Sequence, residues 1–599
     1  MPFIRFRRAA VSAGLCLSPL AALAQATDTV VITAARVPLP IGQVLSDVRL
    51  IERDAIERAG TSSLPQLLQR LGGVEISASG GPGQVAGVFL RGSNANHVVL
   101  LIDGVRVNSA TAGTNALENL PLEQIERIEI LRGPASGLYG ADAIGGVIQV
   151  FTRRADGHDG RVELGSERTR AASLTFGRRA GATHWSLQAG VRDSRNASAT
   201  NADNVFSFNP DRDPYRNANA GAAVSHEWAA GQSLTLRGQL SDGRAHFDAG
   251  PGSDDVNRQR LASVALESRN RLGTGWTSVL RLARGTDDIR TDGAFPSRFR
   301  TDQDQVGWQH DVDAFGGTAA AGIEWRRERV DSDTAFTATE RTVSSLFGSH
   351  AARRGDWSWQ LALRHDRNSQ FGRETTGNLG VGWQVAPRWR LSASAGTAFK
   401  APSFNDLYYP LAFGYSGNPA LRPERSRSAE VAARYANDGF NAGLTVFDNR
   451  ISDLITINSS FTTVENVARA RIEGATLNAA WRSGPWHARA EWTHQRARDE
   501  ATGGPLARRA DDFGSVGVDW AAGRWRIGAD VVASGSRVDS GGAALGGYGL
   551  VNFHAARALS HHWTLSARIH NAADKGYTLV QGYNPPGRGV FVALSFSER

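Results

Sequence analysis

From about residue 155 to the C-terminus, apolar residues recur at every second position. In the run Trp185 to Val191, for example, Trp185, Leu187, Ala189 and Val191 share one face, and Ser186, Gln188 and Gly190 share the other. This period is typical of β-strands. The same alternation recurs at 359–363, 389–393, 440–446, 563–569 and 590–596. Several runs begin with an aromatic residue, as at a membrane interface.

The length of these runs separates a membrane barrel from a soluble sandwich. A tilted strand crossing hydrocarbon needs about ten residues, whereas soluble strands average about five or six. Allowing roughly 20 residues for a strand and its connection, residues 155–599 provide about 22 antiparallel strands. A barrel of that size has a lumen wide enough to need a plug. The fold expected is therefore an all-β transmembrane barrel in contact with outer-membrane lipid.

The N-terminus has the pattern of an export signal. Arg5, Arg7 and Arg8 precede the apolar stretch 9–23, and Ala22-Leu23-Ala24 fits cleavage before Gln25. Residues 1–24 are therefore predicted to be a signal peptide. Cys16 is the only cysteine, so the exported chain has no disulfide framework and no thiolate site.

Residues 25–154 are expected to form a compact α/β plug domain ahead of the barrel at 155–599. Leu64, Leu67, Leu68 and Leu71 share one helical face after the cap at 61–63, and Gly72-Gly73 ends that helix. Short apolar strands are predicted at 98–102, 127–131 and 147–151.

The formal charge of +8 does not indicate a nucleic-acid partner, because the arginines are scattered along the chain rather than clustered. A conventional enzyme is also disfavoured. The chain has no His-Glu-x-x-His and no Gly-x-Ser-x-Gly, and neither Lys400 nor Lys575 follows a glycine as a Walker A lysine must.

Motifs in both regions resemble those of the TonB-dependent receptors of the Gram-negative outer membrane. The plug-type motifs are at 91–94, 102–105, 132–134 and 139–146, and motifs similar to those of the vitamin receptors are at 28–34, 396–402 and 418–424. The resemblance implies active import, with a cobalamin or related corrinoid as the favoured ligand and a monomeric receptor. A siderophore or haem receptor, a passive porin or adhesin, and more remotely a soluble extracellular enzyme are the alternatives.

The segment 28–34 resembles the TonB box of that family. It consists of Asp28, Thr29, Val30, Val31, Ile32, Thr33 and Ala34. A short β-prone segment near the mature N-terminus can add as a strand to the sheet edge of a partner, and the resemblance implies that this partner is the periplasmic domain of TonB. The ordinary alternative is a first strand of the plug.

Two acidic loops offer hard oxygen ligands of the kind that calcium takes. The resemblance implies a calcium site that orders these loops, and the positions that match are Asn196, Asn209, Asp211, Asp213 and Asp248, with the last ligand at Asp255 or Asn257. The alternative is a pair of solvated acidic loops.

The resemblance also implies where a ligand is contacted. Val85, Gly87, Asn94, Ala112 and Gly113 match plug positions that touch cobalamin, and Arg537 matches one on the barrel wall. Asn94 is expected to hydrogen-bond a corrin amide, and the two glycines to let a large flat ligand approach the backbone. One departure from the usual pattern concerns the C-terminus. Most outer-membrane barrels end on an aromatic residue, whereas here Phe596 is followed by three further residues.

Overall fold

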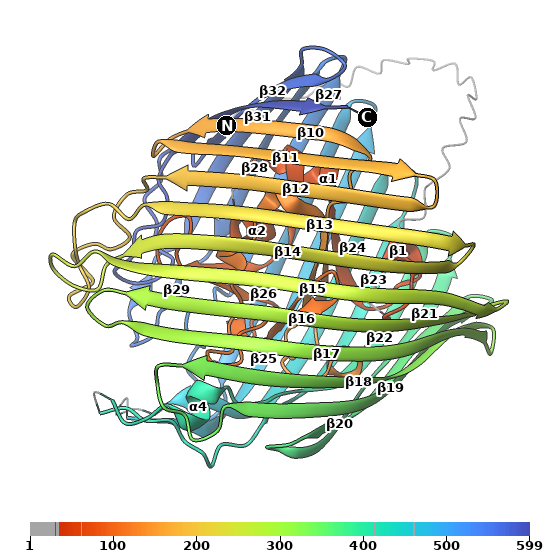
Figure 1. Cartoon of the computed structure of the whole chain (residues 1–599), viewed down its shortest axis with the longest axis horizontal. Coiled ribbons are helices and arrows are strands. Elements are labelled where there is room, and N and C mark those ends of the chain that lie inside the picture. Colours follow the sequence, from red (N-terminus) through yellow and green to blue (C-terminus); the bar gives the residue numbers. More distant parts are fainter. Residues whose placement is uncertain are drawn as a thin grey trace, which may run out of the picture.

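A computed structural model describes residues 30–31, 35–61, 63–412, 414–458, 460 and 462–598. The predicted signal peptide at 1–24 lies outside the described residues. The described chain forms a closed β-barrel with a smaller domain inside it (Figure 1). No helix in the described ranges is long and apolar enough to span a membrane.

Twenty-two antiparallel strands close the barrel, as the sequence predicts. They are β10 (Gly157–Gly165), β11 (Thr169–Ala180), β12 (Thr183–Ser194), β13 (Tyr215–Ala229), β14 (Gln232–Phe247), β15 (Asp255–Gly273), β16 (Trp276–Asp292), β17 (Ser297–Ala314), β18 (Gly317–Ser332), β19 (Glu340–Arg354), β20 (Trp357–Asn368), β21 (Gly372–Ala386), β22 (Trp389–Lys400), β23 (Glu424–Ala436), β24 (Phe440–Ile457), β25 (Val464–Ser483), β26 (Trp486–Asp499), β27 (Asp512–Ala522), β28 (Trp525–Ser534), β31 (Tyr548–Ala558), β32 (Trp563–His570) and β33 (Gly589–Ser597). The last strand pairs with the first, and Phe596 lies opposite Gly160.

The alternation seen in the sequence sets which side chains face outward. On β12, Leu187 and Val191 are 52% and 50% exposed, whereas Ser186 is 4% exposed on the lumen side. Apolar residues therefore cover the lipid face and polar residues face the plug, as in other transmembrane barrels.

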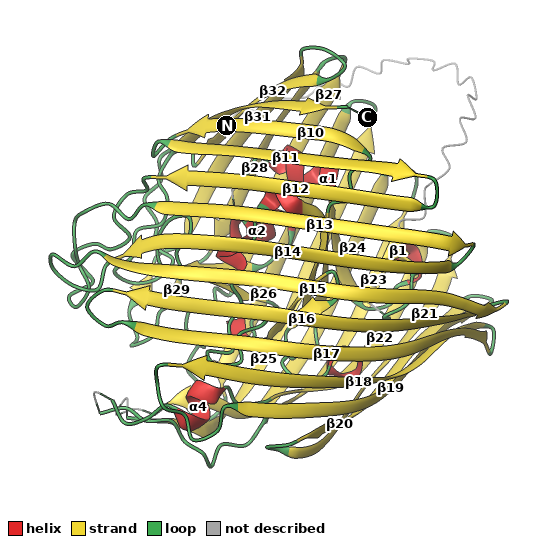
Figure 2. Ribbon diagram, in the orientation of Figure 1, coloured by secondary structure: helices red, strands yellow, loops and turns green. Residues whose placement is uncertain are grey.

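The two ends of the barrel differ (Figure 2). One end has tight turns, such as 181–182 and 230–231, and the other carries long connections, such as 195–214, 401–423 and 500–511. Because the first strand starts at the end with tight turns, both acidic loops lie at the end with long connections. Exposed tryptophans lie at the end with tight turns: Trp228, Trp276, Trp357, Trp389, Trp486, Trp525 and Trp563. In an outer-membrane barrel the long loops are extracellular and the short turns periplasmic.

The plug fills the lumen with a mixed sheet and short helices. Its elements are β2 (Leu39–Pro40), β3 (Asp47–Glu52), α1 (Arg53–Ala59), α2 (Leu64–Leu71), β4 (Glu75–Ala78), β5 (Ala86–Phe89), β6 (Val98–Ile102), β7 (Val105–Arg106), β8 (Ile125–Arg132), α3 (Ser136–Tyr139) and β9 (Gly146–Thr152), with 3-10 turns η1 (Ile41–Gln43), η2 (Ala95–His97), η3 (Leu117–Asn119) and η4 (Leu122–Gln124). The central sheet has the order β3-β8-β9-β6-β7. The predicted helix and the three predicted plug strands are confirmed.

The leucine face of α2 explains how the plug holds together. Leu64, Leu67 and Leu68 are fully buried against apolar residues of β6, β8 and β9. Ser63 is the cap residue of this helix, although its side chain makes no capping hydrogen bond. Gly73, just after the helix, has φ +59°, and a Cβ there would lie 1.6 Å from a carboxylate oxygen of Glu491 on the barrel wall. Only glycine permits this close approach.

Two arginines of the plug motifs anchor the plug to the barrel. Arg132 donates to Glu491 at 2.6 Å, and Arg91 pairs with Asp47 and lies 3.9 Å from Glu430. All these side chains are mostly buried. Because a buried charge is costly unless it is paired, these contacts explain why the motifs need arginine at both positions.

Candidate functional site

Three of the predicted calcium ligands come together at the extracellular end. One carboxylate oxygen from each of Asp211, Asp213 and Asp248 lies within 4.8 Å of the other two. Asp211 and Asp213 precede β13, and Asp248 follows β14, so adjacent antiparallel strands bring the two loops side by side. The prediction that these residues share a site is consistent with this geometry.

The surroundings of Asp211, Asp213 and Asp248, together the aspartate triad, suit a cation. Asp248 and Asp213 are 5% and 2% exposed, and Oδ1 of Asp248 is buried without a hydrogen-bond partner among the described residues. Burial, together with the charges of Asp248 and Asp211, raises the pKa of Asp213 to about 7, and burial likewise raises the pKa of Asp248. Carboxylate oxygens are ligands that calcium prefers, and calcium tolerates varied coordination geometry.

Backbone donors hold the two buried carboxylates in place. Asp213 accepts from the Ala199 N–H at 2.5 Å, and Asp248 accepts from the Thr200 N–H at 3.2 Å. Asn209 ties the two loops together, because its Nδ2 donates to the Ser253 carbonyl at 2.9 Å. The triad therefore stands on a preformed loop framework.

Two other predicted ligands point elsewhere. Nδ2 of Asn196 donates to the Pro82 carbonyl of the plug at 2.9 Å, and its oxygen accepts from the Ser194 hydroxyl. Both oxygens of Asp255 accept from the Ala294 N–H, each at 3.1 Å, and Asp255 is not part of the triad. The reason is that Asp255 opens β15 and faces the next outer turn, at 293–296.

Asn257, the other position considered for the last ligand, is also engaged. Its side-chain oxygen accepts from the Thr291 hydroxyl at 2.8 Å on β16. The structure therefore brings together the three aspartates but adds neither Asp255 nor Asn257 to them.

The plug residues expected to meet a ligand lie at the start of β5 and in two loops, and their exposure differs. Val85 is 54% exposed, and Ala112 is also exposed. Gly113 has φ +71°, which favours glycine, and a Cβ there would make only ordinary contacts. At Gly87 a Cβ would lie 2.9 Å from Oγ of Ser77. A side chain at Gly87 would therefore crowd Ser77 across the β4–β5 pair unless the serine hydroxyl turned away, whether or not a ligand approaches.

Asn94 and Arg537 are both bound within the protein. The side-chain oxygen of Asn94 accepts from Arg509 of the loop 500–511, a residue that the sequence does not single out. Arg537 is 6% exposed, donates to the Thr578 carbonyl at 2.9 Å and lies over the ring of Tyr548. Its guanidinium is therefore already engaged within the protein.

Most of the predicted TonB box lies outside the described residues. Val30 and Val31 form β1 (Val30–Val31), which pairs antiparallel with β2. Just beyond, Arg36 pairs with Glu324 of β18, donates to the Leu138 carbonyl at 3.0 Å and lies 4.1 Å over the ring of Phe347. This attachment depends on contacts with distant strands, so the sequence gives no local signal for it.

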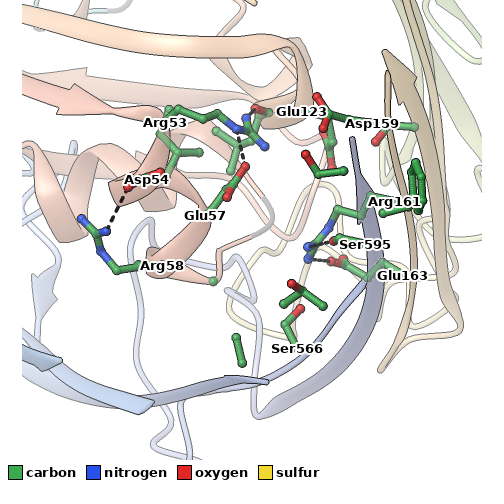
Figure 3. Close-up of a pocket in the computed structure, with 18 of the residues that line it drawn as sticks. Arg53, Asp54, Glu57, Arg58, Glu123, Asp159, Arg161, Glu163, Ser566 and Ser595 are labelled. Carbon is green, nitrogen blue, oxygen red and sulfur yellow. Dashed lines mark hydrogen bonds and ion pairs between the residues drawn. The ribbon is translucent and has the colours of Figure 1, made fainter. Parts of the chain in front are cut away.

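Two large cavities lie between plug and barrel wall. One, of about 580 Å³, separates α1 from β10, β32 and β33 and is lined by ion pairs such as Arg53–Glu57 and Arg161–Glu163 (Figure 3). The other, of about 690 Å³, is lined by Arg36 and the turn at Asp103–Gly104. Neither cavity contains a predicted ligand-binding residue. Both are polar gaps around the plug and are separate from the outer loops.

A plug inside a large barrel, with an N-terminal strand before it, defines an outer-membrane receptor for active uptake. Residues 156–572 match the family model described as TonB dependent receptor-like, beta-barrel, and residues 40–147 match the TonB-dependent Receptor Plug Domain. The chain belongs to the TonB-dependent receptor family. It is thus an outer-membrane protein of a Gram-negative bacterium that binds a ligand and TonB, and it is a transport receptor rather than an enzyme.

Among named relatives, a protein called vitamin B12 transporter BtuB from Photobacterium profundum is 28% identical, over 98% of each chain. A point mutant of the ferric enterobactin receptor PfeA of Pseudomonas aeruginosa has a similar structure, with a TM-score of 0.79 and 18% identity over 95% of this chain and 100% of that one. The siderophore receptor PirA of Acinetobacter baumannii gives a TM-score of 0.78 and 18% identity over 92% and 98% of the two chains. At this identity the two solved structures show the shared fold alone.

Proposed function

We propose that this receptor imports a cobalamin or a related corrinoid. The observation that supports this most is the similarity to a vitamin B12 transporter along the whole length of both chains. The motifs at 28–34, 396–402 and 418–424 point the same way.

Calcium is part of the proposal. Asp211, Asp213 and Asp248 would hold the ion, which would neutralise three like charges and fix both loops in one arrangement. A receptor whose binding-competent form is only partly populated has a weaker apparent affinity by that fraction. Calcium should therefore raise the affinity for the ligand.

Energy coupling is proposed to run through the segment 28–34. Once freed from β2, this segment would add as a strand to the periplasmic domain of TonB, because backbone groups of a short extended segment can complete an exposed sheet edge. The force that TonB exerts on this segment would then act next on the contacts of Arg36 and through them on the plug.

The second candidate is a siderophore receptor, which is favoured by the solved structures that share this fold. Equilibrium titrations of the purified full chain with cyanocobalamin and with ferric enterobactin separate the two, both in excess calcium. Saturable binding of cyanocobalamin alone supports the proposal. Binding of ferric enterobactin alone would refute it.

A further inference from the structure

The loop 500–511, which joins β26 to β27, is docked on the plug through two successive residues. Arg509 donates from Nε to the Gly92 carbonyl at 3.2 Å and from a terminal nitrogen to Oδ1 of Asn94, and its guanidinium lies 4.6 Å over the ring of Phe89. The N–H of the next residue, Ala510, donates to both carboxylate oxygens of Glu75, at 3.0 and 3.1 Å. Arg509 thus reaches the loop that carries Asn94.

This contact fixes which end of the Asn94 amide is engaged within the protein. A guanidinium has only donors, so the atom of Asn94 that meets Arg509 must be the carbonyl oxygen. Nδ2 of Asn94 donates to no group in the described part of the chain, and the side chain is only half-buried. The amide hydrogens are therefore the part of Asn94 that is left for a ligand.

The backbone of Asn94 is held by a second residue, His97. Its N–H donates to Nδ1 of His97 at 3.2 Å, and Nε2 of the same ring lies 2.6 Å from a carboxylate oxygen of Glu424 on β23. Both His97 and Glu424 are buried. Because Arg509 of the barrel holds the side chain of Asn94 and His97 of the plug holds its backbone, the orientation of Asn94 is set before a ligand arrives, and prior ordering of this kind lowers the cost of binding.

We propose that Arg509 is a positioning residue that makes Asn94 a hydrogen-bond donor to the ligand. The ligand group at this point must then be an acceptor, such as the carbonyl oxygen of a carboxamide. This inference deepens the proposed function and rests on it, since Asn94 is a ligand contact only in that proposal.

A double-mutant cycle with cyanocobalamin tests this directly. Equilibrium dissociation constants are measured for the purified full chain, Asn94→Ala, Arg509→Ala and the double variant, after heat-modifiability on gels has shown that each barrel is folded. Arg509→Ala should weaken binding about tenfold, the worth of one well-made hydrogen bond. If Arg509 acts through Asn94, the double variant should bind no more weakly than Asn94→Ala alone.

Two further variants separate positioning from support of the loop. Asn94→Asp keeps the acceptor for Arg509 but has no N–H to offer, so it should bind as weakly as Asn94→Ala. Arg509→Lys keeps one donor and should restore most of the affinity, but only where Asn94 is present. Arg508→Ala is the matched control, because Arg508 lies in the same loop but pairs with Asp539 of the connection between β28 and β31 and not with Asn94. Its loss should change affinity less than about twofold, well below the roughly tenfold expected for one hydrogen bond to Asn94.

Two results would overturn the inference while leaving the proposed function intact. One is an equal loss on Arg509→Ala with and without Asn94, which would mean that Arg509 acts independently. The other is wild-type affinity in Asn94→Asp. If the wild-type chain binds no cyanocobalamin at all, both the proposed function and this inference fail together.

Discussion

At the residue scale, the main electrostatic feature of the candidate site is the clustering of the carboxylates of Asp211, Asp213 and Asp248. Three carboxylates whose oxygens lie within 4.8 Å of one another repel unless a proton or a cation intervenes. With its pKa raised to about 7, the carboxyl of Asp213 is partly protonated near neutral pH when no cation is bound. A cation that bound to this proposed site would displace the proton.

Replacing Asp211 and Asp213 together by asparagine should remove most of the effect of calcium on ligand binding. The change keeps the size of both side chains and removes two of the three charges that the ion would neutralise. Cyanocobalamin titrations of wild type and variant, each in excess calcium and in excess chelator, measure the effect. If the variant keeps the wild-type calcium dependence, the ion binds elsewhere.

The pKa of Asp213 also predicts a pH dependence for calcium. A metal ligand must be deprotonated to bind, and a carboxyl whose pKa is about 7 is mostly protonated at pH 6 and mostly ionised at pH 8. Calcium affinity should thus rise on the order of tenfold from pH 6 to pH 8, because binding releases a proton. Calcium titrations at the two pH values measure this, with Asp213→Asn as the control that should flatten the response. An affinity that falls as pH rises would contradict the reasoning.

Some residues of the candidate site could be placed from the sequence, and others could not. The three aspartates could be placed together because their loops flank neighbouring strands. The orientation of Asp255 could not be predicted, since its carboxylate contacts the turn at 293–296, which is about 40 positions away in the sequence and leaves no local signal. Arg509 is 415 positions from Asn94 in sequence, so only the closed barrel brings the two into contact.

At the scale of elements, the strands were the most predictable part of the chain. Alternation fixes their phase, because a shift of one residue would turn every lipid-facing side chain into the lumen. On β12, Leu187, Ala189 and Val191 are exposed, as the sequence predicts for the lipid face. The ends of the strands and the paths of the long loops leave no such periodic signal.

The assignment of alternate residues to lipid and lumen can be tested by substituting two neighbouring residues of β12. Leu187→Arg would place a charge on the lipid face, at a cost of about 2–4 kcal/mol near mid-bilayer, whereas Gln188→Arg faces the polar lumen. Leu187→Arg should therefore impair assembly far more than Gln188→Arg. Heat-modifiability of both variants in membranes measures the folded fraction, and equal fractions would show that the strand phase is wrong.

The segment around β1 gives a test of energy coupling. Val31→Pro removes a backbone donor from a strand that is proposed to pair with TonB, and it leaves the outer loops untouched. Uptake of labelled cobalamin should be abolished while equilibrium binding stays near the wild-type value. Arg154→Pro is the control, because this exposed position between plug and barrel lies outside the proposed TonB segment and should leave uptake intact. Normal uptake by Val31→Pro would rule out strand addition at this segment.

At the scale of the whole molecule, the plug fills the lumen of the closed barrel. The ion pair Arg132–Glu491 and the close approach of Arg91 to Glu430 hold the plug against the barrel, and polar cavities of about 580 and 690 Å³ remain around it. The sequence predicts this architecture from length, alternation and the glycine-rich motifs. It does not predict how plug and barrel interlock, because each contact joins residues hundreds of positions apart.

The central claim is that this receptor takes up a corrinoid with energy supplied through TonB. The most direct measurement is uptake of radiolabelled cyanocobalamin by cells that lack their own cobalamin receptor and express this chain, with and without a functional TonB. The account predicts saturable accumulation that requires both the chain and TonB. Cells that accumulate no cyanocobalamin although the folded receptor is present in their outer membrane would contradict it.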